Sequence, residues 1–474
     1  MERFDIIAIG GGTAGLVTAA GAANLGLRAA LVEREVLGGD CLWTGCVPSK
    51  ALIASGRAAH TIDRAAALGL RVKAPAIDAG AVLERMRQAR AAAARPDDTE
   101  RFRKMGVEVV FGAARFAARD RIDVAGRWLE APRMVVATGA RPAVPPIPGL
   151  EDAGYLTHLT VFDLETLPRR LVVIGGGPVG LELAQTYQRL GTAVTVLETL
   201  PRVLPHEDPE AADVLANTLR AEGVDLRTGR AVERVEGGPG SARRIHTKDG
   251  DGNPEVIETD EVLVATGRKP HTAGLNLEAI GVRLEGGAVL VDGALRASVP
   301  GIWAAGDVAG GPQFTHVADY HAKLVLRNAV FPFSRRVDYS AVPAVTYTDP
   351  EVARIGLTEE QARARHGAVH VYRYDLADLD RAIVDAATTG FVKVVTRGGG
   401  RILGATVVAR GGGETIVPLA LAMRHKLGLP ALSQLVYPYP TMAEGVKRAA
   451  DAYYRRKLAG GAGRWLRRVV SWLT

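Results

Sequence analysis

The sequence FDIIAIGGGTAGLVTAAGAANLGLRAALVER at residues 4–34 returns in outline as RLVVIGGGPVGLELAQTYQRLGTAVTVLET at residues 170–199. In each copy a short apolar run leads into a G-x-G-x-x-G turn and an Ala- and Leu-rich segment. A second apolar run then ends in an acid, Glu33 or Glu198. This order predicts a strand, a helix and a second strand. We therefore expect two β-α-β units of the kind that binds a dinucleotide.

Three glycines in each string are expected to allow a tight turn, a close approach of the backbone to a pyrophosphate, and close packing of helix on strand. They are Gly10, Gly12 and Gly15 in the first string and Gly175, Gly177 and Gly180 in the second. The N-terminus of the following helix favours a phosphate, because its N–H groups are unpaired. A carboxylate such as Glu198 accepts hydrogen bonds from ribose hydroxyls and repels a 2′-phosphate. It favours NADH, while Arg202 nearby leaves NADPH open as the alternative.

Composition limits the classes of protein to which the chain can belong. At 474 residues the chain is expected to form about three domains. Its 47% apolar and 23% charged residues are typical of a globular protein with a large core. Two cysteines are too few for a disulfide-stapled scaffold or a structural zinc site built on cysteine alone, so no metal site is expected. The net charge of +7 attracts anions, but 5% aromatic residues speak against a nucleic-acid platform.

Other strand-and-turn signals follow the two glycine strings. MVVATGARP at 134–142 and VLVATGRKP at 262–270 each end an apolar run in Ala-Thr-Gly, and GIWAAGDVAGG at 301–311 places Asp307 directly after another. From residue 341 the pattern changes to strand-like pieces at 390–396 and 402–409 and helices at 413–426 and 442–459. The predicted fold class is α/β, with two Rossmann-like dinucleotide-binding domains and a C-terminal α+β domain.

The only cysteines, Cys41 and Cys46, lie in GGDCLWTGCVPSKAL at residues 38–52. In a regular helix their Cα atoms would be about 8.7 Å apart, beyond the roughly 7 Å that a disulfide can bridge. Gly45 and Pro48 can supply the irregular turn that a local, reducible disulfide needs. Two ordinary thiols are the alternative interpretation.

Over residues 4–455 the order of these motifs resembles the class I pyridine nucleotide-disulfide oxidoreductases, which include dihydrolipoamide dehydrogenase, glutathione reductase and mercuric reductase. The resemblance implies an FAD-binding domain at 1–150 and 271–340 and an NAD(P)-binding domain at 151–270. It also implies a dimerisation domain at 341–455 and a homodimer whose active sites are shared between subunits. Residues 456–474 form a tail outside the resemblance.

The same resemblance implies roles for single residues. Cys46 would face the flavin and Cys41 would attack the substrate, while Lys50 would lie beside flavin N5 with Glu182 as its ion-pair partner. Asp307 would hold the ribitol of FAD. The full set of expected cofactor-binding residues is Gly10, Gly12, Gly15, Glu33, Gly39, Thr138, Gly139, Gly306 and Asp307, with Gly175, Gly177, Gly180, Glu198 and Gly267.

The chain departs from the family pattern near its C-terminus. Where glutathione reductase and dihydrolipoamide dehydrogenase carry an acid/base histidine, this chain has Tyr439, followed by Glu444 in the place of the family glutamate. A phenol titrates near pH ~10, against about 6.5 for imidazole, so it is a poor proton acceptor at neutral pH. Mercuric reductase also has tyrosine there, but its C-terminal cysteine pair is missing from this chain.

The expected function is therefore an FAD-dependent enzyme that passes electrons from NADH through FAD to a Cys41–Cys46 disulfide. The acceptor is a disulfide, a metal ion or another group, free or protein-bound. One alternative is dihydrolipoamide dehydrogenase itself. Another, from a different class, is a slowly reacting flavin redox sensor or a membrane-docked partner protein.

The tail RWLRRVVSWLT at 464–474 follows the glycine-rich GGAG at 460–463. At helical spacing its basic residues, Arg464, Arg467 and Arg468, separate from an apolar face formed by Trp465, Leu466, Val469, Val470, Trp472 and Leu473. Such a helix suits a membrane surface, with docking on a protein as the alternative. The chain starts at once in a strand-like run without a leader-like segment, so the expected location is the cytoplasm, with peripheral contact at the inner face of the membrane.

Overall fold

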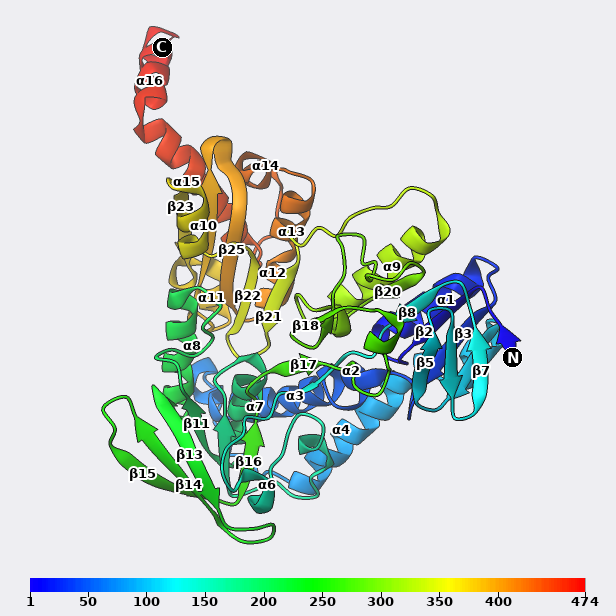
Figure 1. Ribbon diagram of the computed structural model, residues 1–474. Helices are drawn as coiled ribbons and strands as arrows, with labels where there is room; N and C mark the ends of the chain where they lie inside the picture. The colour runs from blue at the N-terminus through cyan, green and yellow to red at the C-terminus, as the bar shows by residue number, and fades with distance from the viewer. Residues whose placement is uncertain (474) are drawn as a thin grey trace.

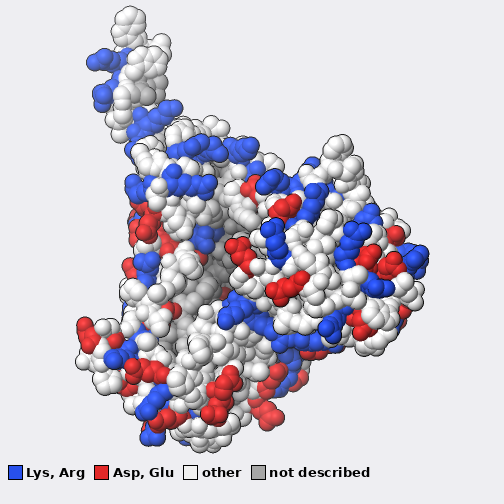
Figure 2. Space-filling view, in the orientation of Figure 1, with Lys and Arg blue, Asp and Glu red and all other residues white. Residues whose placement is uncertain are grey.

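A computed structural model describes residues 1–473, without the side chains of residues 462, 466 and 467, so the predicted places of Leu466 and Arg467 on the tail lie outside the described side chains. Three units are visible in Figure 1, each built around its own sheet. A hollow separates the third unit from the first on the face shown in Figure 2.

The first unit has a five-stranded parallel sheet in which one strand, β8, joins the N-terminal strands to a strand from far along the chain. Its order is β20 (Ile302–Ala304), β8 (Met134–Val136), β2 (Ile6–Ile9), β3 (Ala29–Glu33) and β4 (Val107–Phe111). Strands β2, β8 and β20 are entirely buried, as their continuous apolar sequences require in a sheet covered on both faces. Helices α1 (Thr13–Asn24) and α9 (Thr315–Val330) pack against one another beside this sheet.

The second unit repeats this design with a four-stranded parallel sheet. Its order is β12 (Asp225–Thr228), β11 (Ala193–Glu198), β10 (Arg170–Ile174) and β16 (Glu261–Val264), with helices α7 (Pro178–Arg189) and α8 (Pro209–Ala221). The first and second units each carry a smaller sheet as well. These are β1 (Glu2–Arg3), β7 (Arg127–Glu130), β6 (Arg121–Val124) and β5 (Ala114–Ala118) in the first, and β13 (Arg230–Glu236), β14 (Arg243–Asp249) and β15 (Pro254–Thr259) in the second.

The third unit has an antiparallel five-stranded sheet. Its order is β21 (Pro343–Thr346), β22 (Glu351–Gly356), β25 (Arg401–Ala409), β24 (Phe391–Arg397) and β23 (His370–Asp375). The helix expected at 413–426 is interrupted, because Pro418 begins a new turn where a continuous helix would need its N–H. The helices here are α12 (Gly412–Thr415), α13 (Val417–Arg424), α14 (Leu429–Gln434) and α15 (Glu444–Ala459), with α10 (Glu359–His366) and α11 (Asp380–Val384) between the strands.

Three further helices connect the first unit to the other two: α2 (Gly39–Trp43), α3 (Cys46–Asp63) and α4 (Ala79–Ala94). One continuous core includes Leu52 of α3, Leu181 of α7 and Phe391 of β24. Two short strands, β9 (Ala140–Pro142) and β17 (Arg268–Pro270), pair between the first and second units. The cysteine-bearing helix therefore lies where the three units meet.

A buried cation also holds the second unit to the third. Lys393 of β24 is 3% exposed, and its Nζ lies 3.0 Å from Asp208 Oδ1 and 2.7 Å from Glu210 Oε1. Both acids stand at the start of α8. Because Lys393 and Asp208 are both buried, their pairing is far less screened by solvent than a surface ion pair.

The tail forms α16 (Gly461–Leu473), which begins earlier than expected. The helix was expected from residue 464, after the glycine-rich segment at 460–463, but residues 461–463 are helical too, so only Gly460 separates α16 from α15. No helix of residues 1–473 is long and apolar enough to cross a membrane.

Candidate redox site between the three units

The two cysteines lie on either side of an irregular turn. Cys41 belongs to α2, and Cys46 is the first residue of α3. Gly45 makes the turn, and a Cβ there would lie 2.7 Å from the Asp40 carbonyl oxygen, so this close approach requires glycine. Pro48 lies within the first turn of α3, where its missing N–H costs no helical hydrogen bond. Both cysteines are free thiols in this structure.

The pKa values of the two thiols are shifted in opposite directions. A hydrogen bond from the Cys41 thiol lowers the pKa of Cys46 to about 6, against the opposing effect of burial, with further lowering from Thr315 and Lys50. The same hydrogen bond and partial burial raise the pKa of Cys41. Thr315 Oγ1 lies 3.4 Å from Cys46 Sγ, at the first residue of α9. When the pair is reduced, Cys46 is therefore the cysteine that favours the thiolate at neutral pH.

An ion pair lies beside Cys46. Lys50 Nζ, one turn along α3, lies 2.8 Å from Oε2 of the buried Glu182 on α7. The other oxygen, Glu182 Oε1, accepts the backbone N–H of Tyr347 at 2.9 Å. The Tyr347 ring lies against the cation, with 4.5 Å from Lys50 Nζ to the ring centroid. All three units thus contribute to the surroundings of the thiolate.

The first and third glycines of each string are required by packing alone. A Cβ on Gly10 would overlap the carbonyl oxygen of Ala137, which precedes Thr138 and Gly139, and a Cβ on Gly15 would overlap the carbonyl oxygen of Gly10. The second string repeats both contacts, with Gly175 against Ala265 and Gly180 against Gly175. Each Ala-Thr-Gly segment therefore packs directly against the turn of the glycine string beside it.

The middle glycines have a different environment. A Cβ on Gly177 would meet nothing within 4 Å, and one on Gly12 only the Cα of Gly39, at 3.8 Å. Both glycines precede a helix and give its first turn no side-chain cap. Unpaired N–H groups facing open space at a helix N-terminus form a cradle for a phosphate. Both strings therefore fit a dinucleotide pyrophosphate.

The acids that end the second strands support these cradles. Glu33 Oε2 accepts the N–H of Gly11 at 2.6 Å, and Glu198 Oε2 accepts the N–H of Gly176 at 2.7 Å. Each carboxylate keeps acceptor capacity for ribose hydroxyls, because an ionised carboxylate has about four lone-pair sites. Arg202, which leaves NADPH open as the alternative, is half-buried, and its Nε has no hydrogen-bond partner among the described residues.

Asp307 lies in a half-buried charge cluster. Arg268 bridges two acids, with 2.7 Å to Asp307 Oδ2 and 2.6 Å to Asp40 Oδ2. Burial raises the pKa of Asp307, against the lowering effect of Arg268. The Nε of Arg268 is buried without a hydrogen-bond partner among the described residues. A polyhydroxyl chain such as ribitol would supply partners to both groups, so this site fits FAD.

A buried histidine, His321, accepts a hydrogen bond from the turn around Gly306. The Gly306 N–H donates to Nδ1 of the fully buried His321 at 3.2 Å, and His321 Nε2 lies 2.8 Å from the Tyr339 hydroxyl. Burial lowers the pKa of His321 to about 4, so the ring is neutral at pH 7. Gly139 and Gly267 both have positive φ and open space at the Cβ position, and the Thr138 hydroxyl donates to the His271 carbonyl.

Tyr439 and Glu444 lie apart from this cluster. Tyr439 is 69% exposed in the third unit, and its hydroxyl donates to Asp380 Oδ2 at 3.0 Å. Glu444 begins α15 and is buried. No hydrogen bond or ion pair joins either residue to Cys41 or Cys46 within the described residues of one chain. The expectation that they act on the active site of a partner subunit stays a prediction.

Sequence reasoning overlooked four residues of this site: Asp40, Arg268, Thr315 and Tyr347. Arg268 lies in the second Ala-Thr-Gly motif and Thr315 follows the segment that contains Asp307, so their positions in the sequence could have indicated a role in the site. Tyr347 carried none, because it reaches Lys50 only through the packing of the third unit on α3. Trp43 packs locally: its Nε1 donates to the Leu37 carbonyl at 2.7 Å.

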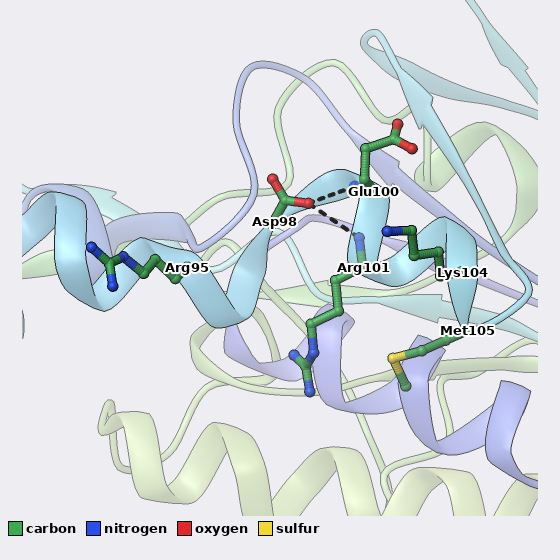
Figure 3. A pocket seen from close by; sticks show the side chains of 6 residues that line it. All are labelled: Arg95, Asp98, Glu100, Arg101, Lys104 and Met105. Carbon is green, nitrogen blue, oxygen red and sulfur yellow. Dashed lines mark hydrogen bonds between the residues drawn. The ribbon is translucent and has the colours of Figure 1, made fainter.

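A surface pocket of about 540 Å³ lies elsewhere, at the N-terminus of the short helix α5 (Thr99–Lys104). Figure 3 shows Asp98 capping this helix through the N–H groups of Glu100 and Arg101. The pocket includes none of the expected site residues, and its hydrogen bonds serve the helix cap. No group of three metal-ligating side chains occurs within the described part of the chain.

Comparisons with known proteins agree with this arrangement. Residues 4–322 match the family described as "Pyridine nucleotide-disulphide oxidoreductase", and residues 342–450 match its dimerisation domain. A mercuric reductase from Streptomyces lividans is 38% identical over 461 residues, covering 95% of this chain and 96% of the relative. Dihydrolipoyl dehydrogenase 3 from Pseudomonas aeruginosa is 36% identical over 469 residues, covering 97% and 99%.

Solved structures give the same result. The Cu(II) complex of the HOCl-induced flavoprotein disulfide reductase RclA from Escherichia coli superposes with a TM-score of 0.86 at 28% identity, covering 95% of this chain and all of that one. The likeness extends over the three units, so the α/β fold with a C-terminal dimerisation domain is confirmed.

Proposed function

Because the chain belongs to the pyridine nucleotide-disulphide oxidoreductase family, an FAD- and NAD(P)H-dependent family of enzymes, we propose that it passes electrons from NADH through FAD to the Cys41–Cys46 pair. The proposal rests above all on the surroundings of Cys46, whose Sγ lies 3.4 Å from Thr315 Oγ1 and beside the Lys50–Glu182 ion pair. The Cys41 thiol, Thr315 and Lys50 lower the pKa of Cys46, which favours a thiolate on this sulfur.

The glycine strings supply the two nucleotide sites in this proposal. Gly12 and the N-terminus of α1 would hold the pyrophosphate of FAD, and Asp307 its ribitol. Gly177 and the N-terminus of α7 would hold the pyrophosphate of NADH, and Glu198 its ribose. When bound there, FAD would supply the redox chemistry that links NADH to the disulfide.

The chain's own residues then control the sulfur chemistry. The electron pair breaks the Cys41–Cys46 bond, leaving a thiolate on Cys46 and, after uptake of one proton, a thiol on Cys41. Lys50 and the Thr315 hydroxyl stabilise the charge on Cys46. Glu182 positions Lys50. By the family resemblance, Cys41 would meet the acceptor once its proton leaves.

The acceptor we favour is a soft metal ion held by the two sulfurs. Reduction of Hg²⁺ would take the electron pair from two thiolates, re-form the S–S bond and leave neutral mercury, whereas the same electron pair would reduce two Cu²⁺ ions to Cu⁺. No organic thiol has to be protonated as a leaving group. Thiol–disulfide exchange needs a proton donor and acceptor near neutral pH. Asp380 raises the pKa of Tyr439 through its hydrogen bond, so this phenol is a weaker acid and even less of it is present as the phenolate that could accept a proton.

The relatives support this choice by name, since they include mercuric reductases and a Cu(II)-complexed disulfide reductase. A dihydrolipoyl dehydrogenase activity is the competing assignment, because relatives of that name are similarly close. The dimerisation domain at 342–450 supports a homodimer.

The test is an anaerobic NADH titration of the FAD-loaded enzyme and of the Cys41→Ser and Cys46→Ser variants. The parent should take up one electron pair for the flavin and a second for the disulfide, and each variant only the first. Equal uptake by parent and variants would exclude the disulfide as a redox centre. Turnover is then compared with Hg²⁺, Cu²⁺ and lipoamide, and faster turnover with lipoamide would favour the competing assignment.

A further inference from the structure

The C-terminal helix α16 extends away from the third unit. In Figure 1 it projects beyond the end of α15, at the far end of the third unit from the second unit. Trp465 is 66% exposed, Trp472 94% and Leu473 82%. Large apolar side chains exposed together on one segment mark a surface that binds something. This segment has no place in the redox chemistry of the cysteine pair.

The register of α16 separates apolar from basic residues completely. At 3.6 residues per turn, the described apolar residues fall within an arc of about 160°. They are Trp465, Val469, Val470, Trp472 and Leu473. Arg464, Arg468 and Ser471 share the opposite side of the helix. A short helix with tryptophans on one side and arginines on the other is the pattern of helices that lie in a bilayer interface.

The charge of this end of the chain is of one sign. No acidic residue follows Asp451, and six basic residues do: Arg455, Arg456, Lys457, Arg464, Arg467 and Arg468. Arg455, Arg456 and Lys457 are exposed at the end of α15, next to α16. Figure 2 shows basic side chains along one side of the projecting helix and at its base. The surface complementary to this end is therefore anionic.

We propose that α16 lies in the surface of an anionic phospholipid bilayer, with Trp465, Trp472 and Leu473 among the acyl chains and the arginines at the lipid phosphates. The charge argues against a second copy of the chain as the occupant, because two such tails would bring their basic residues together. It also explains why apolar and basic groups share one short segment. The inference does not depend on the acceptor proposed for the cysteine pair.

The experiment is cosedimentation of the FAD-loaded full-length dimer with vesicles of phosphatidylcholine alone and with added phosphatidylglycerol. The parent should bind only the anionic vesicles, and salt should release it. Deletion of residues 460–474 should abolish binding. Arg464→Gln and Arg468→Gln should each weaken it roughly fivefold, from about 1 kcal/mol per basic residue at the surface.

Matched controls come from exposed positions elsewhere in the chain. Trp472→Ala should lower binding at least as far as the arginine variants, whereas Trp128→Ala, an equally large change on the exposed strand β7, should leave it unchanged. Arg119→Gln, in an exposed loop, is the control for charge. NADH oxidation should be the same in all variants, so loss of vesicle binding cannot be confused with failure of the redox proposal.

Two results would overturn the inference. One is equal sedimentation of the parent with neutral and anionic vesicles, or with neither. The other is a tail deletion that converts the dimer to monomers, since α16 would then be covered by the second subunit.

Discussion

Lys50 Nζ and Glu182 Oε2 lie 2.8 Å apart, joining the helix that begins with Cys46 to the helix that follows the second glycine string. The two charges act on Cys46 in opposite directions: Lys50 lowers its pKa and Glu182 raises it. Lys50→Met should therefore raise the pKa of Cys46 above its value of about 6, whereas Glu182→Gln should lower it.

The measurement is the pH dependence of thiolate absorbance and of alkylation rate in the reduced protein. Arg64→Gln, which removes a cation at the far end of α3, is the matched control and should leave the pKa unchanged. An unchanged pKa in Lys50→Met would show that Lys50 does not stabilise the thiolate.

The glycine strings predict that substitutions at neighbouring glycines have different effects. Gly177→Ala should leave the free energy of unfolding within about 1 kcal/mol of the parent, because the added Cβ meets no atom within 4 Å. It should nevertheless raise the KM for NADH at least tenfold and leave FAD content unchanged. Gly180→Ala should lose folded protein instead, because its Cβ would overlap the Gly175 carbonyl oxygen.

Thermal unfolding, flavin content and steady-state kinetics distinguish the two variants. Gly12→Ala makes the corresponding test of the first string and should lose FAD while the apoprotein stays folded. Normal NADH kinetics in Gly177→Ala would contradict the assignment of the second string.

Tyr439→His should increase disulfide reduction. An imidazole near its ordinary pKa of about 6.5 can accept and donate protons at neutral pH, and a positioned acid/base group typically contributes roughly 10²–10⁴-fold. We expect at least tenfold faster turnover with lipoamide and little change with Hg²⁺. Tyr437→His, two residues away, is the control. No gain with lipoamide would mean that residue 439 does not reach the sulfur pair in the dimer.

The stability of the first unit should depend on pH through His321. Its folded pKa of about 4 is below the unfolded value near 6.5, so the unfolded chain binds more protons between these pH values. The stabilisation is complete above pH ~6.5 and is lost as pH falls towards 4, by up to about 3 kcal/mol. His321→Gln should flatten this part of the profile, whereas His366→Gln, at an exposed position, should not. Urea unfolding at a series of pH values measures the free energy of unfolding of parent and variants.

The two nucleotide-binding units were predictable because their determinants are local. A glycine string, the helix after it and the acid at the end of the next strand lie within about thirty residues of one another, so spacing alone reveals them. The resemblance to a known family supplied the pairing of Lys50 with Glu182. Spacing could not, because these residues lie on different units.

Contacts between units were not predictable from periodicity. Tyr347 reaches Lys50, and Arg268 reaches both Asp40 and Asp307, only after the units have packed. The glycine-rich composition of residues 460–463 was also a poor guide to the start of α16. Glycine favours a linker in sequence, yet residues 461–463 are helical, as glycine allows at a modest cost of about 1 kcal/mol per residue.

The buried cation between β24 and the start of α8 has a mechanical consequence. Lys393 ties the unit expected to hold NADH to the unit that carries the dimer contact, so moving one away from the other breaks its ion pairs with Asp208 and Glu210. Breaking a largely buried pair is costly, because it separates charges that were placed to compensate one another. We therefore expect the boundary between these two units to resist opening when the nicotinamide nucleotide binds.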